Sequence, residues 1–231
     1  MKKIISTLVV LALFAGSIFA LDLDVAFGGA YGFASLKTVN ENSNETTKKT
    51  DNAIGFKVGS RLGLSNDLGL KINAGFIFPT EGTKVSITDS KGNSTEATVK
   101  NDKAMVLNCF IGPVYTIKAN KNLKLEIGAG LDIAYNKYTN IYEETKILGY
   151  TIIPKSTRTT SYLSYGLGAT FDAQYALSKK MSLQFGVDAA YLWGNKVKLV
   201  ITAGDSTDTS SDSYKATGFY FIPDISLVYR F

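Results

Sequence analysis

The chain of 231 residues contains no His and a single Cys, Cys109. Nucleophilic and general acid–base catalysis most often uses a His to move a proton, and transition metals in proteins are held mainly by His and Cys. A single Cys also excludes a disulfide within the chain. We therefore predict no catalytic residue, no metal site and no cofactor.

Long apolar runs are missing after the first twenty residues, so we expect no transmembrane helix in that part of the chain. The net charge of +5 is mild and dispersed, which argues against a nucleic-acid partner. No change in composition marks a linker. The remaining length, about 211 residues, fits one all-β domain.

The first twenty residues have the pattern of a secretory signal peptide. Lys2 and Lys3 form a positive start, residues 4–14 are mainly apolar, and small residues follow. We predict a Sec signal peptide at 1–20, cleaved after Ala20 or, alternatively, after Ser17. The mature domain would then span 21–231.

The rest of the sequence is dominated by alternation. Large apolar residues occupy nearly every second position from Phe219 to Phe231, and the residues between them are mixed. Successive side chains of a strand point to opposite faces, so this period predicts a strand with two different faces. The pattern recurs along the chain and predicts eight strands, at residues 21–34, 53–64, 68–79, 104–117, 123–137, 162–177, 181–194 and 218–231.

Short and long connections alternate between these strands. Residues 65–67, 118–122 and 178–180 are short, whereas 35–52, 80–103, 138–161 and 195–217 are long and polar. An up-and-down barrel places short turns on one rim and long loops on the other, and strands of this length can cross an outer membrane. We predict an all-β fold, an eight-stranded antiparallel up-and-down transmembrane β-barrel. Ten strands remain an alternative if parts of 80–103 and 138–161 also cross.

All charges within the predicted strands fall on the face opposite the bulky residues, and Gly and Ala are abundant on the same face. Small residues leave room for a few long side chains inside a narrow barrel, whereas Gly would only weaken a water-exposed strand. The polar face therefore lines the lumen, and the inside-out alternative is a soluble lipocalin-like carrier. The predicted lumen charge network, in which buried charges must pair, comprises Asp22, Asp24, Lys57, Arg61, Lys71, Lys124, Glu126, Asp132, Asp172, Asp188, Asp224 and Arg230.

Aromatic residues gather at the strand ends, as expected for girdles at the two membrane–water boundaries. The predicted interface residues are Tyr31, Phe33, Phe78, Tyr115, Tyr135, Tyr175, Tyr191, Trp193, Phe219 and Tyr229.

The carboxyl terminus alternates Leu227, Tyr229 and Phe231. With its export signal and eight strands, the chain resembles the small bacterial outer-membrane β-barrel proteins of the OmpX and OmpA-transmembrane type. That resemblance implies an outer-membrane location, with the lipid bilayer as a partner. It also implies that the barrel-assembly machinery recognises the three terminal residues, and it implies little about activity.

We predict a non-enzymatic protein, because the familiar enzymes of this class depend on a His. We also predict that polar side chains largely fill its lumen. Its exposed loops would serve envelope structure, surface interaction or adhesion. Residues 84–100, 147–153 and 197–202 are predicted to extend strands beyond the membrane and to offer edges to a surface ligand. The alternative function is a narrow porin-like channel or small-solute transporter.

Overall fold

The computed structural model describes residues 23–40, 46–79, 83–88, 94–99, 103–142, 145–147, 150–153, 156–194, 197–203, 206–212 and 214–231. The predicted signal peptide and Asp22 lie outside the described residues. Among the described residues, no helix is long and apolar enough to cross a membrane.

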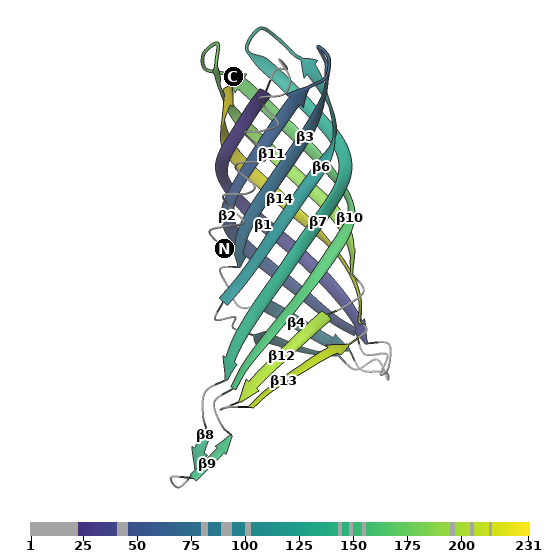
Figure 1. The fold of residues 1–231 in the computed structure, drawn as a ribbon, viewed down its shortest axis with the longest axis vertical. Helices are drawn as coiled ribbons and strands as arrows, with labels where there is room; N and C mark the ends of the chain where they lie inside the picture. The colour runs from purple at the N-terminus through teal and green to yellow at the C-terminus, as the bar shows by residue number, and fades with distance from the viewer. Residues whose placement is uncertain are drawn as a thin grey trace.

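Eight long antiparallel strands form a closed barrel (Figure 1). They are β1 (Leu23–Asn40), β2 (Thr46–Gly63), β3 (Leu68–Pro79), β6 (Lys103–Lys118), β7 (Leu123–Tyr142), β10 (Ser156–Ala176), β11 (Met181–Gly194) and β14 (Tyr214–Arg230). Sequence neighbours pair around the ring, and pairing of β1 with β14 closes it. The predicted eight-stranded up-and-down barrel is confirmed.

Shorter strands extend the long-loop rim. The hairpin of β4 (Thr83–Thr88) and β5 (Ser94–Val99) pairs with β2, and the hairpin of β12 (Val197–Ala203) and β13 (Ser206–Asp212) pairs with β10. A separate hairpin joins β8 (Thr145–Ile147) to β9 (Tyr150–Ile153). All three overlap the segments in which the sequence predicts strand extensions. They lie outside the ring, so the ten-stranded alternative is wrong.

Several barrel strands are longer than predicted, mainly toward the long-loop rim. β2 begins at Thr46, β7 ends at Tyr142 and β10 begins at Ser156, whereas alternation predicted limits at 53, 137 and 162. The alternation of large apolar residues ends where the wall leaves the apolar band, but strand pairing continues beyond it. The alternation of apolar side chains therefore predicts the lipid-facing segment of each strand and not the full length of the strand.

The register fixes the tilt of the strands. The paired residues lead once around the ring from Ala26 back to Leu36 on the same strand, a stagger of ten residues. For eight strands, this stagger corresponds to a tilt of about 40° from the barrel axis, from a rise of about 3.3 Å per residue and a strand spacing of about 4.8 Å. Following cross-strand partners from β1 to β2 and onward around the ring, each partner therefore lies closer to the long-loop rim than the one before it.

The short turns are held by a repeated local contact. Ser65 Oγ accepts from Leu68 N (3.1 Å), Asn120 Oδ1 from Leu123 N (2.9 Å) and Ser178 Oγ from Met181 N (3.1 Å). Short polar side chains satisfy the backbone of tight turns in this way. This contact explains why three short polar segments suffice to reverse the chain.

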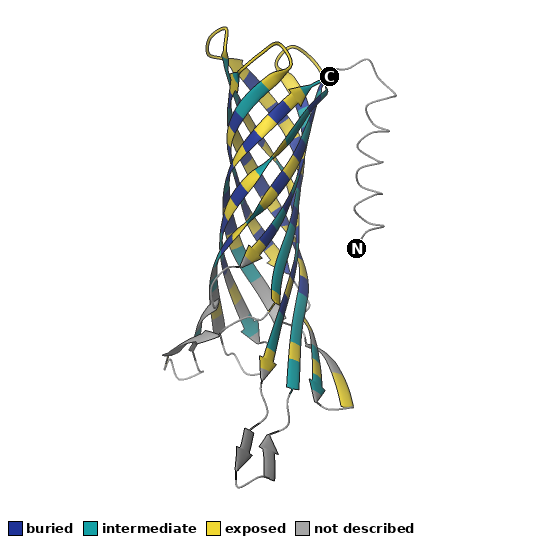
Figure 2. Cartoon of the chain, turned by 90° about the vertical axis from the view of Figure 1, so that its left-hand side faces the viewer, coloured by how far each residue is buried: buried dark blue, intermediate teal, exposed yellow. Residues whose placement is uncertain are grey.

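Burial alternates through the middle of the barrel strands (Figure 2). Leu167 is 62% exposed on the outer wall, whereas Asp172, five residues along the same strand, is 0% exposed. A wall of exposed Leu, Ile, Phe and Tyr side chains around a charged interior is stable in lipid and not in water. The predicted orientation, apolar outside and polar inside, is the orientation of a transmembrane barrel.

Candidate functional site

The lumen holds eleven charged side chains of the barrel strands. Among the described residues, the six acids are Asp24, Glu126, Asp132, Asp172, Asp188 and Asp224, and the five bases are Lys57, Arg61, Lys71, Lys124 and Arg230. All are buried except Lys124 and Arg230, which are half-buried. They lie in groups that follow one another from the short-turn rim toward the long-loop rim.

At the short-turn rim, Arg230 forms a two-pronged contact with Asp24. Arg230 Nε lies 2.8 Å from Asp24 Oδ1, and its terminal nitrogen donates to Oδ2 at 3.1 Å. These residues are direct partners in the β1–β14 register. Together with Lys124 they line a cavity of about 210 Å³ at this mouth, to which the turn residues Lys121, Lys179 and Lys180 add positive charge.

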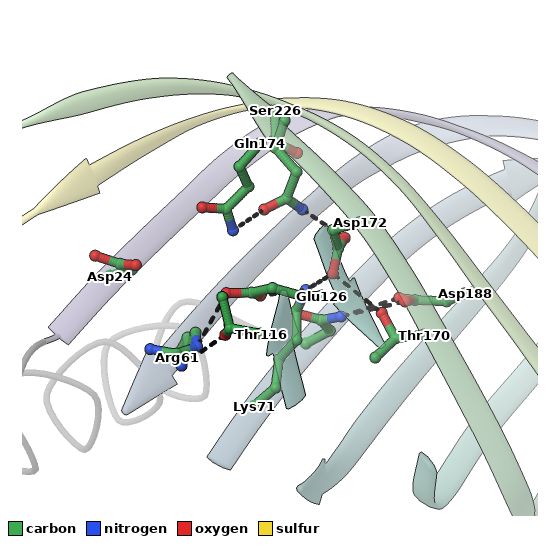
Figure 3. A network of polar contacts seen from close by, with 12 residues as sticks. Asp24, Arg61, Lys71, Thr116, Glu126, Thr170, Asp172, Gln174, Asp188 and Ser226 are labelled. Atoms are coloured by element: carbon green, nitrogen blue, oxygen red, sulfur yellow. Dashed lines mark hydrogen bonds and ion pairs between the residues drawn. The ribbon is translucent and has the colours of Figure 1, made fainter. Parts of the chain in front are cut away.

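The next group is built around Glu126 and Asp172 (Figure 3). Arg61 Nε lies 2.9 Å from Glu126 Oε1, and an Arg61 terminal nitrogen donates to Thr116 Oγ1 at 2.9 Å. Lys71 Nζ contacts Asp172 and lies 3.8 Å from Glu126 Oε2. One lysine thus bridges two carboxylates across the lumen.

Two glutamines extend this group. Gln184 Nε2 donates to Asp172 Oδ1 at 2.8 Å, and Gln174 Nε2 donates to Gln184 Oε1 at 3.1 Å. Both amides are buried, so the hydrogen bonds satisfy groups that would otherwise be costly to bury.

The central group is built around Lys57. Its Nζ lies 2.8 Å from Asp188 Oδ2 and 2.6 Å from Asp224 Oδ1. Asn73 Nδ2 donates to Asp188, and Ser226 Oγ donates to Asp224 at 2.6 Å. All five side chains are buried, and the single lysine is the cation shared by two carboxylates.

Asp132 stands apart from these ion pairs. Its Oδ2 accepts from the Tyr220 hydroxyl, to which Asn108 Nδ2 also donates at 3.3 Å. No described Lys or Arg lies within ion-pair distance of this buried carboxylate, and its Oδ1 has no hydrogen-bond donor among the described residues. Asp132 therefore marks the end of the ion-paired part of the lumen.

Beyond Asp132 the interior becomes apolar, which sequence reasoning missed. The buried cluster comprises Ala30, Ala53, Ile77, Ala134, Ala190, Leu192, Tyr220 and Ile222. Tyr138 and Tyr162 stack in a second cluster, with ring centroids 6.3 Å apart. The large inward-facing residues Ile77, Leu192 and Ile222 are visible in the sequence as exceptions on the charged face and could have predicted this layer.

Glycine makes room for the charged groups. A Cβ added at Gly186 would collide with the carboxylates of Asp224 and Asp172, and one added at Gly75 would collide with the Asn108 amide. By contrast, Gly29 has no atom within 4 Å of an added Cβ. The small lumen residues thus stand where large polar side chains cross from neighbouring strands.

The predicted interface aromatics all lie on the outer wall, exposed or half-buried. Tyr191 and Trp193 meet edge to face with centroids 5.1 Å apart, and Tyr229 meets Phe231 in the same way at 4.9 Å. Leu227, Tyr229 and Phe231 are all exposed on this wall. Tyr165, which the sequence prediction omitted, lies ten residues before Tyr175 on β10, so their rings are about 25 Å apart along the axis, the height of an outer-membrane apolar band.

Five of the six described lumen carboxylates contact a Lys or Arg side chain. Among the residues that the structure describes, no group of three or more Cys, Asp and Glu side chains could hold a metal ion.

A protein-family profile described as "Domain of unknown function (DUF2715)" matches residues 19–229. No curated protein matches the sequence. Among solved structures, the outer membrane protein OprG from Pseudomonas aeruginosa aligns with a TM-score of 0.57 and 12% identity, over 92% of this chain and 96% of that chain. A major outer membrane protein from Thermus thermophilus aligns with a TM-score of 0.57 and 11% identity, over 88% and 99%. At these identities the likeness shows the fold, an outer-membrane type of β-barrel.

Proposed function

The chain belongs to the DUF2715 family, whose description assigns no function, and we propose that it is a non-enzymatic protein of the bacterial outer membrane. Its closed barrel anchors strand extensions that serve surface interaction or envelope structure. The observation that carries the proposal is the inside-out distribution of residues, with ion-paired charges within and apolar side chains on the outer wall. Two features support delivery from the periplasm: the predicted signal peptide, and the position of the first and last barrel strands' outer ends at the short-turn rim.

The absence of catalysis is proposed from the residues, since the fold alone does not decide it. The chain has no His to serve as a base. A lumen carboxylate could replace it only if it were free to take up a proton, and five of the six described ones contact a Lys or Arg. Incubation of the refolded protein with phospholipid vesicles and with peptide libraries should give no product.

We also propose that the lumen does not conduct. Phe110 and Val114 are almost completely buried inside the barrel, and the apolar cluster lies toward the long-loop rim. In planar bilayers the refolded protein should give no discrete current steps, as in protein-free controls. Steps that grow larger with Phe110→Ala, which removes buried bulk from the lumen, would establish the alternative narrow channel.

The basic cavity at the short-turn mouth is the observation that favours this alternative, because it would attract small anions. Replacing Lys121, Lys179 and Lys180 by Gln would lower anion selectivity in a channel. It would leave the current at the protein-free level in a closed barrel.

The hairpins on the long-loop rim supply the interaction surface in this proposal. β5 pairs only with β4, and β13 only with β12, among the described strands. Their free edges can add a partner strand by main-chain hydrogen bonds. Removing both hairpins should abolish binding to host or neighbouring cells, while heat-modifiable gel mobility shows that the barrel is still folded. Unchanged binding would contradict the adhesion part of the proposal.

A further inference from the structure

The outer wall carries an apolar groove of about 690 Å³ across β10, β11, β14 and β1. Ala169 and Ala189 are direct cross-strand partners, and their small side chains form the floor of the groove. Large side chains surround them, so the groove is lined by Phe33, Leu167, Tyr191, Phe219 and Phe221. It faces the bilayer.

A pair of lysines lies beyond the groove on the same wall. Lys37 of β1 and Lys48 of β2 are direct cross-strand partners, and both are exposed. Like charges directly opposite each other destabilise a sheet unless a counter-charge is present. No described acidic side chain forms an ion pair with either lysine.

The neighbouring positions of the same register do not supply the counter-charge either. The residues that flank the pair on β1, β2, β4 and β14 are Ser35, Val39, Thr46, Thr50, Ser86 and Thr217. None is acidic. Along the same row, Glu96 of β5 is two strands away from Lys48, about 10 Å across the sheet, and so is not its cross-strand partner. Among the described residues nothing neutralises the two positive charges, which leaves them available to an anion from outside the protein.

The strand tilt places the lysine pair above the groove. Four residues separate Phe33 from Lys37, about 13 Å of strand, which at a tilt of about 40° raises Lys37 by about 10 Å and shifts it sideways by about 9 Å. The paired row from Phe33 through Phe221 to Ala189 descends and shifts in the same sideways direction. The floor at Ala189 therefore lies about 16 Å below Lys37 and almost directly beneath it.

We propose that this wall is a specific site for an anionic, phosphate-bearing lipid of the outer leaflet. The headgroup phosphate lies between Lys37 and Lys48, and one acyl chain lies in the groove over Ala169 and Ala189. On β10, Tyr165 of the outer wall stands four residues, about 10 Å of height, above Ala169, so the groove lies below the outer aromatic girdle, among acyl chains, and the lysine pair lies above it, on the headgroup side. Tyr191 and Trp193 border the intervening wall, where amphipathic rings favour the boundary between headgroups and chains.

Both parts are needed for selectivity. Any apolar groove in this wall contacts acyl chains, but only the lysine pair distinguishes an anionic headgroup from a zwitterionic one. Conversely, exposed lysines attract anions weakly at physiological salt, and the groove adds the apolar contact that retains a lipid.

The test measures lipid retained by the refolded full mature chain, using native mass spectrometry with phosphatidylglycerol and phosphatidylcholine of identical acyl chains. The wild type should retain several-fold more phosphatidylglycerol. Lys37→Gln with Lys48→Gln should abolish that preference, and Ala169→Leu with Ala189→Leu should lower retention of both lipids. The matched controls are Lys103→Gln with Lys137→Gln, exposed on β6 and β7, and Ala173→Leu on β10 outside the groove. They should behave like the wild type.

Three results would overturn the proposal: an unchanged preference in the lysine variant, an equal loss in the lysine control, or displacement of the lipid by equimolar glycerol 3-phosphate. The last result would indicate a site for a soluble phosphate. Heat-modifiable mobility checks that each variant is folded. The substituted lysines lie beyond the apolar band, so we expect the lysine variant to fold. That variant alone tests the preference for an anionic headgroup, even if the leucine variant fails to fold.

Discussion

Lys57 gives the sharpest test of the ion-paired lumen. It is 3% exposed and is the cation shared by Asp188 and Asp224. In Lys57→Met both carboxylates keep only neutral donors, from Asn73 and Ser226. Breaking a buried ion pair by removing one partner costs about 3–5 kcal/mol, and two uncompensated carboxylates place this variant at the upper end, about 5 kcal/mol.

The same reasoning predicts a rescue. Adding Asp188→Asn and Asp224→Asn removes the uncompensated charges while keeping side chains of similar shape. The triple variant should regain most of the loss and unfold within about 2 kcal/mol of the wild type. Arg230→Gln is the comparison and should cost less than Lys57→Met, because the Arg230 side chain is 36% exposed and that of Lys57 is 3% exposed.

Urea titration of the refolded protein in lipid vesicles, followed by gel mobility without heating, measures these free energies of unfolding. A loss below about 1 kcal/mol for Lys57→Met would refute the reasoning. So would a triple variant no more stable than the single one, because the cost would then not arise from unpaired charge.

Three further predictions follow from the lumen and the rim. Gly186→Val should lower the refolding yield because an added Cβ would collide with the carboxylates of Asp224 and Asp172, whereas Gly29→Val should refold normally because an added Cβ there meets no atom within 4 Å. Tyr220→Phe leaves Asp132 and Asn108 without a shared partner and should lower the free energy of unfolding by about 1–3 kcal/mol; equal stability in a urea titration would contradict that contact. Replacing residues 197–212 by a short Gly-Ser linker removes only the β12–β13 hairpin; an unchanged heat-modifiable shift is expected, and loss of the shift would show that the barrel depends on it.

The sequence predicted the strands that cross the membrane and the direction of each face. Alternation between Phe219 and Phe231 is local information, and burial follows it residue by residue. Register is different, because shifting a strand by two residues preserves the alternation. The stagger of ten residues therefore had to come from the structure.

Partner choice inside the lumen was equally hidden from the sequence. Lys57 meets Asp224, 167 residues away, and Tyr220 meets Asp132, 88 residues away. The inward charges alone cannot say that Lys57 serves two carboxylates and that Asp132 has no cation among the described residues. The groove and the lysine pair were hidden for the same reason, since they depend on which outward rows lie side by side.

The central claim is that the outer face of the barrel meets lipid. Spin labels on Cys introduced at Leu167 and Phe185, after Cys109→Ser, report their surroundings in lipid vesicles; Thr170 on the inner face of β10 is the comparison. The outer labels should be relaxed strongly by dissolved oxygen and weakly by a water-soluble nickel complex, and the label at Thr170 should be shielded from oxygen. Outer labels that meet the nickel complex more readily than oxygen would contradict a lipid-facing outer wall.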